Sequence, residues 1–163
     1  SRYSIVLGKI VGETLVSITQ GVAVVLFGLV LGVSITPSKA LGFLWVGIII
    51  CLFGAAFGVL LLSNLKSQRA ANQIFPFIML PQLFLAGVFT PIQNLPWLLD
   101  ILSRISPMRY AVDLARGMFY TNSPEYQSVV LSHPIFNLTV IFVLFAVFVS
   151  TGTWLFVRHE RDQ

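Results

Sequence analysis

The chain has 163 residues, of which 56% are hydrophobic and only 10% are charged. A soluble domain carries about 25% charged residues, so this composition argues against an ordinary water-soluble protein. The formal net charge of +4 does not indicate a nucleic-acid-binding protein, because the basic residues neither collect in a run nor cluster on one face.

Charged residues are absent from four long stretches of the sequence, and each stretch exceeds the roughly 20 residues that a helix needs to cross a bilayer. The sequence therefore predicts an all-α, polytopic membrane protein that forms a single transmembrane domain over residues 1–163. The four transmembrane helices are expected at about 12–33, 41–64, 73–91 and 135–157.

Two alternatives stay open for residues 1–11, in which Arg2 and Lys9 bracket apolar residues. The segment can form a short helix on the membrane surface, or it can be the basic-flanked start of the first span. Within that span, polar side chains such as Gln20 can bond across to other helices.

The third expected span contains Pro81, which removes a backbone hydrogen bond and predicts a kink. Gln82 follows it directly. A kink beside an amide side chain can line a transport path or make a helix–helix contact, and the contact is the preferred interpretation.

Between the third and fourth spans, residues 95–120 predict a hairpin of two short helices, at roughly 96–105 and 107–119. Asn94 before Pro96 and Ser106 before Pro107 are typical of helix starts, because a side-chain oxygen can cap free N–H groups and proline fits the first turn. Each helix would be near 15 Å long, about half of a bilayer core. The hairpin is therefore expected to be re-entrant or interfacial.

The hairpin carries charges at helical spacing. Arg104 follows Asp100 by four residues, and Arg109 and Arg116 flank Asp113 at spacings of four and three, so both carboxylates are expected to be paired locally. If Asp113 is exposed, each pair is worth about 0.5 kcal/mol or less. If Asp113 instead lies between its arginines in a partly dehydrated cleft, removing its charge leaves the arginines without a partner, at a cost of about 3 kcal/mol.

Basic residues suggest the orientation of the chain. With four spans, the chain start, the 65–72 loop and the tail lie on one side of the membrane, which holds six Lys or Arg residues, and the other side holds four. Three of those four are expected to be paired within the hairpin. Cytoplasmic loops carry an excess of Lys and Arg, and discounting the three paired arginines sharpens the bias, so the start, the 65–72 loop and the tail are predicted to be cytoplasmic. The hairpin then lies on the outer face of the cell membrane.

Residues 72–117 resemble the permease subunits of type-2 ABC exporters, such as the daunorubicin-resistance permeases. Where that family commonly has proline, threonine or leucine and tyrosine, this chain has Pro107-Met108-Arg109-Tyr110, which leaves the helix start intact. The matching motifs are Ala86-Gly87-Val88-Phe89 with Pro91, Leu95-Pro96-Trp97-Leu98, Ser106-Pro107-Met108-Arg109-Tyr110, Asp113-Leu114-Ala115-Arg116-Gly117 and Leu7-Gly8-Lys9.

The resemblance implies a six-helix permease of which this chain is the last four helices, the first two being absent. It implies a second permease copy and a separate ABC ATPase partner that binds ATP and magnesium. Arg2, Tyr3 and Lys9 would help to dock that ATPase. The hairpin, with Asp100, Arg104, Arg109, Asp113 and Arg116, would form an outer gate. An amphiphilic drug, a lipid or a polysaccharide-type compound would be exported.

The sequence offers no catalytic constellation, so an enzyme is not expected. His133 and His159 lie on opposite sides of the last span and cannot share a metal, and Cys51 is the only cysteine, which excludes a thiolate cluster. Gly8-Lys9 lacks the rest of a phosphate-binding loop, so this chain is expected to bind no cofactor. The alternative function is a membrane channel or structural subunit without ATP coupling.

Overall fold

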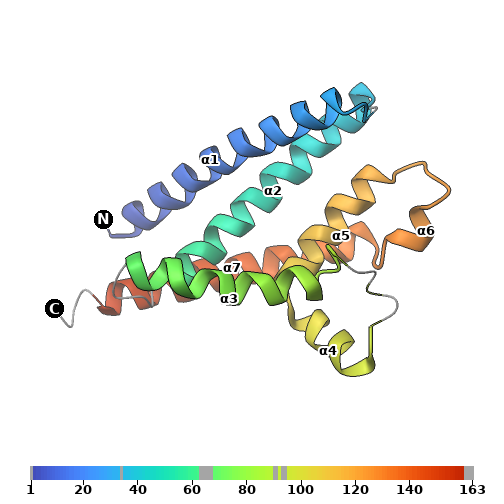
Figure 1. The fold of residues 1–163 in the computed structure, drawn as a ribbon. Coiled ribbons are helices and arrows are strands. Elements are labelled where there is room, and N and C mark those ends of the chain that lie inside the picture. Colours follow the sequence, from blue (N-terminus) through green and yellow to red (C-terminus); the bar gives the residue numbers. More distant parts are fainter. Residues whose placement is uncertain (1, 34, 63–67, 90–91, 93–94, 160–163) are drawn as a thin grey trace. The chain divides into compact units, whose positions relative to one another are not determined.

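The computed structural model describes residues 2–33, 35–62, 68–89, 92 and 95–159, and these contain helices, turns and no strand (Figure 1). The all-helical prediction is confirmed over this part of the chain. Contacts divide the chain into two compact units, and α7 contributes to both. Unit 1 comprises Ser1–Asn64 and Phe145–Gln163, and unit 2 comprises Leu65–Leu144.

Unit 1 is built on two long helices that lie side by side, α1 (Arg2–Val30) and α2 (Pro37–Leu62). Helix α1 is continuous from Arg2, which agrees with residues 1–11 being the start of the first helix. Gly32 ends this helix with φ +86°, and the amide of Val33 donates to the carbonyl of Gly28 at 3.0 Å. Glycine takes this left-handed conformation without a Cβ penalty, so the chain can reverse after α1.

The core of unit 1 contains Ile10 from α1 together with Ala55 and Val59 from α2. The last helix of the chain, α7 (Pro134–His159), adds Phe148, whose ring stacks on Phe53 with centroids 5.6 Å apart. These contacts between the helices of unit 1 are apolar.

Within the described residues, three segments are long and apolar enough to cross a membrane, and their outward side chains include Val24 and Val30, 70% and 83% exposed. Exposed apolar side chains that continue along a whole helix, as on α1, are unfavourable in water and expected in lipid. The three candidate spans are Leu7–Val30, Lys39–Leu61 and Tyr126–Leu155.

The predicted third span falls on α3 (Gln68–Leu85), which has 18 residues, or about 27 Å at 1.5 Å per residue. Its apolar part, Gln73–Leu85, is shorter than the candidate spans. Pro76 and Pro81 both lie inside the helix. Gly87 then ends it with φ +75°. That α3 crosses the bilayer therefore stays a prediction.

Unit 2 contains the two short helices of the predicted hairpin, α4 (Trp97–Ile105) and α5 (Pro107–Phe119). Their bounds agree with the predicted 96–105 and 107–119. A further short helix, α6 (Tyr126–Val129), precedes α7.

The predicted capping by Ser106 is wrong. Its backbone takes the extended conformation that ends α4 and starts α5, but its hydroxyl makes no cap bond and is buried without a partner. The Ser106 carbonyl already accepts the amide of Arg109 at 3.2 Å, which is one of the two N–H groups that a capping hydroxyl at this position would bind. Helix α4 has Pro96 at its cap position, and Asn94 lies outside the described residues.

Candidate functional site: the helical hairpin and its anchors

Asp113 lies on the inner side of α5, and its side chain is buried, with 2% of the residue exposed. Its Oδ1 accepts the amide of Leu131 at 2.8 Å. Its Oδ2 accepts the amide of Ser132 at 2.9 Å and the Nδ2 of Asn137 at 2.7 Å. One carboxylate thus receives three hydrogen bonds from the turn before α7 and from the first turns of that helix.

The expectation that Asp113 pairs with Arg109 and Arg116 is therefore wrong. Helical spacing places the three side chains near one another on α5, but the carboxylate points toward backbone N–H groups that have no helical partner of their own. Burial without a partner is costly for a charged group, and these donors meet that requirement in place of the arginines. Of the two open alternatives, the dehydrated environment of Asp113 is confirmed and its charged partners are not.

Arg109 contacts the preceding helix. Its Nη1 lies 3.2 Å from Oδ1 of Asp100 and 2.8 Å from the Ser103 hydroxyl, and its side chain is 12% exposed. Arg104 pairs with the same carboxylate at 3.0 Å, which confirms the predicted pair within α4. Hydrogen bonds from Arg109 and then from Arg104 hold the pKa of Asp100 below its ordinary value.

The hairpin is also fixed to the carboxyl end of α3. The hydroxyl of Ser103, a residue that is fully buried, donates to the carbonyl of Leu85 at 2.6 Å. Arg116 donates through Nη2 to the carbonyl of Gly87. The last carbonyls of a helix have no partner inside it and favour positive charge, so a hydroxyl and an arginine are suitable ligands for them.

Helix α4 has its polarity reversed relative to a helix of a soluble protein. Its buried residue is the polar Ser103, whereas a soluble helix buries an apolar stripe. Large apolar side chains on its other sides are exposed, and Trp97 and Ile105 reach 75% and 72%. Such a surface is expected where the surroundings are lipid rather than water.

The other predicted site residues lie on α1, in unit 1, and on α3, in unit 2. Lys9 and Gln20 are exposed on α1, in unit 1, and the side chains of Arg2 and Tyr3 lie outside the described part. On α3, Pro81 is exposed and Gln82 is half-buried. The path or contact role of Gln20, Pro81 and Gln82 stays a prediction.

Two residues of this site, Ser103 and Asn137, were missed by sequence reasoning. Neither lies at helical spacing from its partner, since Asn137 is 24 positions from Asp113 and Ser103 is 18 positions from Leu85. The available signal was that each is a polar residue within an otherwise apolar stretch, because a polar side chain that becomes buried needs a hydrogen-bond partner. Over the described residues, His, Cys, Asp and Glu side chains form no group of three or more that could hold a metal.

Comparison with known proteins gives two matches. A family model described as "ABC-2 type transporter" matches residues 1–120. The protein named "Putative transport permease ycf38" of Cyanophora paradoxa is 24% identical over 161 residues, which are 97% of this chain and 56% of that protein. The chain therefore spans about half the length of this relative. No solved structure matches the chain.

Proposed function

Because the chain belongs to the ABC-2 type transporter family, we propose that it is part of the permease subunit of an ATP-driven exporter. The observation that carries this proposal is the family match over residues 1–120, which includes α4 and α5 of the hairpin. The exported compound would be an amphiphilic drug, a lipid or a polysaccharide-type molecule.

The exporter would contain parts that this chain lacks. An ABC ATPase would bind ATP and magnesium and supply the energy, and a second permease copy would complete the transport path. The complete permease would also contain further helices, since the chain spans only 56% of the length of its relative. The cytoplasmic end of α1, with Arg2, Tyr3 and Lys9, would dock the ATPase, and the exposure of Lys9 is compatible with that role.

In the proposed topology α3 is the third of four spans, both ends of the chain are cytoplasmic, and the hairpin lies on the outer face of the cell membrane. The reversed polarity of α4 supports a position at the membrane interface, because its apolar surface would be solvated by lipid. The length of α3, about 27 Å, is near the roughly 30 Å thickness of a bilayer core.

The hairpin would serve as the outer gate, moving as one body with the helices that it joins. It is bound to the end of α3 through Ser103 and Arg116 and to the start of α7 through Asp113. A shift of α3 would therefore be transmitted to the start of α7, because buried hydrogen bonds to a charged group resist separation. The pair of Arg109 and Asp100 would brace the two helices of the gate against each other, and Arg104 would hold the Asp100 carboxylate within α4.

The alternative is a channel or structural subunit without ATP coupling, and reconstitution distinguishes the two functions. The complete permease and its ATPase are placed in proteoliposomes with a fluorescent amphiphile. Transport that requires ATP and magnesium, and that an ATPase unable to hydrolyse ATP abolishes, is the expected result. Movement of the amphiphile that is equal with and without hydrolysis would show a channel and overturn the proposal.

The same system tests the coupling segment. Lys9→Glu in the complete permease should reduce ATPase recovery during co-purification, because it reverses a charge near the proposed contact. Lys39→Glu is the matched control, since Lys39 lies at the opposite end of the α1–α2 pair. Equal ATPase recovery for both variants would reduce residues 2–9 to a helix flank.

A further inference from the structure

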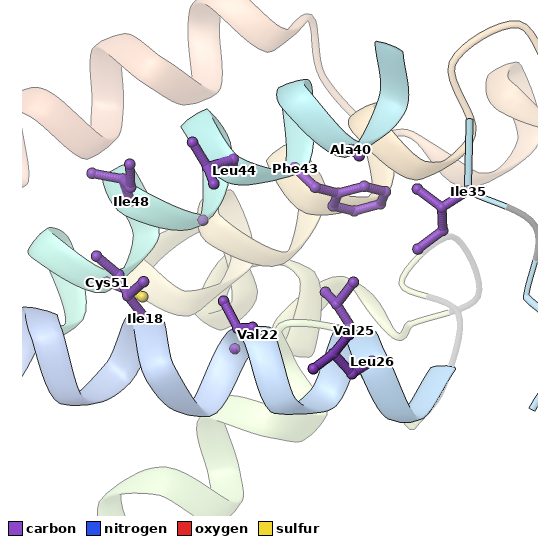
Figure 2. A pocket seen from close by; sticks show the side chains of 12 residues that line it. Ile18, Val22, Val25, Leu26, Ile35, Ala40, Phe43, Leu44, Ile48 and Cys51 are labelled. Atoms are coloured by element: carbon purple, nitrogen blue, oxygen red, sulfur yellow. The ribbon is translucent and has the colours of Figure 1, made fainter. Parts of the chain in front are cut away.

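An apolar groove with a volume of about 300 Å³ runs between α1 and α2 (Figure 2). Its sides are formed by Ile18, Val22 and Leu26 from α1 and by Phe43, Ile48 and Cys51 from α2. Its lining is apolar side chains, two glycines and the thiol of Cys51. No group there can hold a water molecule by several hydrogen bonds.

Two glycines create the hollow. Gly21 and Gly47 both line the groove, and a Cβ added to either would meet no atom within 4 Å. Each therefore leaves a gap where a larger side chain would have filled the space between the helices. An unfilled gap forfeits dispersion contacts with its lining, so an apolar occupant is favoured.

The dimensions of the groove match a chain-like molecule. Its lining extends from Ile18 to Leu26 on α1 and from Ala40 to Cys51 on α2, which is about 12 Å and 16 Å at 1.5 Å per residue. One leaflet of a bilayer is about 15 Å of hydrocarbon, half of the roughly 30 Å core. The groove begins beside the turn between the two helices, where Ile35 lines it, and follows them for about the depth of one leaflet.

A positive charge lies at the same end. Lys39 is the only charged residue between Glu13 and Lys66, and it precedes Ala40, which lines the groove. It also lies one helical turn before Phe43, so the two side chains share a face of α2. A lysine at the rim of a membrane helix extends its ammonium group to the interface, where lipid phosphates are found.

We propose that this groove is a binding site for a bilayer phospholipid, with one acyl chain between α1 and α2 and the phosphate near Lys39. The lipid is a resident component of the protein, not its transported compound, so the inference goes beyond the proposed function. It rests on the apolar lining, the leaflet-length groove and the charge at its mouth.

The direct test uses the complete permease in nanodiscs that contain a phospholipid with a photoactivatable group on its acyl chain. After irradiation, labelled peptides should be concentrated on the groove side chains of 18–26 and 40–51. Labelling spread evenly over outward residues such as Val24 and Val30 would overturn the site. Loss of the label on addition of the fluorescent amphiphile used in the transport assay would also overturn it, because the groove would then be a substrate site.

A matched pair of variants tests the same site by a second measurement. Gly47→Leu fills the groove, whereas Gly54→Leu lies on the same helix, also in open space, and outside the lining. Native mass spectrometry should show one fewer tightly bound phospholipid per chain for Gly47→Leu and an unchanged number for Gly54→Leu. An equal number of retained lipids in both variants would contradict the proposal.

The charge is tested with nanodiscs of mixed phosphatidylglycerol and phosphatidylcholine. Lys39→Gln should lower the retained ratio of anionic to zwitterionic lipid about fivefold, which is the effect expected of one basic residue near a membrane surface. If a short bifunctional maleimide joins the Cys51 residues of two copies in the membrane, a second chain occupies the groove and the proposal fails.

Discussion

The most informative single substitution is Asp113→Asn, because it changes one oxygen of a buried carboxylate into an NH₂ group. In the protein both oxygens accept hydrogen bonds, and the donors are the amides of Leu131 and Ser132 and the side chain of Asn137. An asparagine at this position keeps one acceptor oxygen and directs its NH₂ group at another donor. At least one of the three hydrogen bonds is lost, and a buried N–H group is left without an acceptor.

The size of the effect follows from these contacts. A hydrogen bond to a charged group contributes about 1.5–3 kcal/mol, and a buried unsatisfied donor costs about 1–3 kcal/mol. We therefore expect the free energy needed to separate the start of α7 from α5 to fall by about 3 kcal/mol. Since each 1.4 kcal/mol is a factor of ten, the local opening equilibrium should rise about 100-fold.

Hydrogen exchange measures this opening directly, because the amides of Leu131 and Ser132 are themselves the donors. Exchange of a peptide that contains both should be about 100-fold faster in Asp113→Asn. Asn137→Ala, which removes one of the three donors, should show a smaller acceleration, about tenfold. Asp100→Asn alters a half-buried carboxylate of the same hairpin that makes no contact with Leu131 or Ser132, and it should leave these two amides protected. Wild-type protection of both amides in Asp113→Asn would refute the reasoning.

Three other substitutions test the remaining contacts, each by thermal unfolding of the purified permease. Hydrogen bonds from Arg109 and then Arg104 lower the pKa of Asp100 from its ordinary 3.8, so the stabilisation that they provide is present above pH 3.8 and is lost as the pH falls through the lowered pKa. The difference in unfolding temperature between wild type and Asp100→Asn should therefore be constant from about pH 5 to 8 and vanish in stronger acid. A difference that changes near pH 6 would contradict this assignment. Ser103→Ala removes the donor to the end of α3 and should destabilise the protein by about 1–2 kcal/mol, whereas unchanged stability would show that this anchor is unimportant. Gly152→Leu places a side chain on α7 where a Cβ already lies 3.3 Å from the backbone of α2 and should cost about 1–3 kcal/mol, while Gly12→Leu, in open space, should not.

The sequence was sufficient for features that depend on neighbouring residues. The break between α4 and α5 was predicted because proline, here Pro107, is favoured in the first turn of a helix, and the pair of Asp100 and Arg104 was predicted from its spacing of four. The apolar stretches predicted membrane helices because each lacked charge over the length of a bilayer.

Contacts between distant residues were beyond the same reasoning. Asp113 is bound by groups 18 to 24 positions away, so the nearby arginines were the only partners that helical spacing could suggest. Arg109 reaches a carboxylate nine positions away on another helix. The groove likewise depends on Gly21 and Gly47 lining the same space, which no periodicity within a single helix indicates.

The central claim is that α3 crosses the membrane, so that the hairpin and the loop before α3 lie on opposite faces. Single cysteines at Ser123, after the hairpin, and at Ser67, before α3, are introduced into a Cys51→Ser background of the complete permease. An impermeant thiol reagent should modify the cysteine at 123 in intact cells and the cysteine at 67 only after permeabilisation. Modification of both from outside, or of neither, would place them on one side of the membrane and contradict the claim.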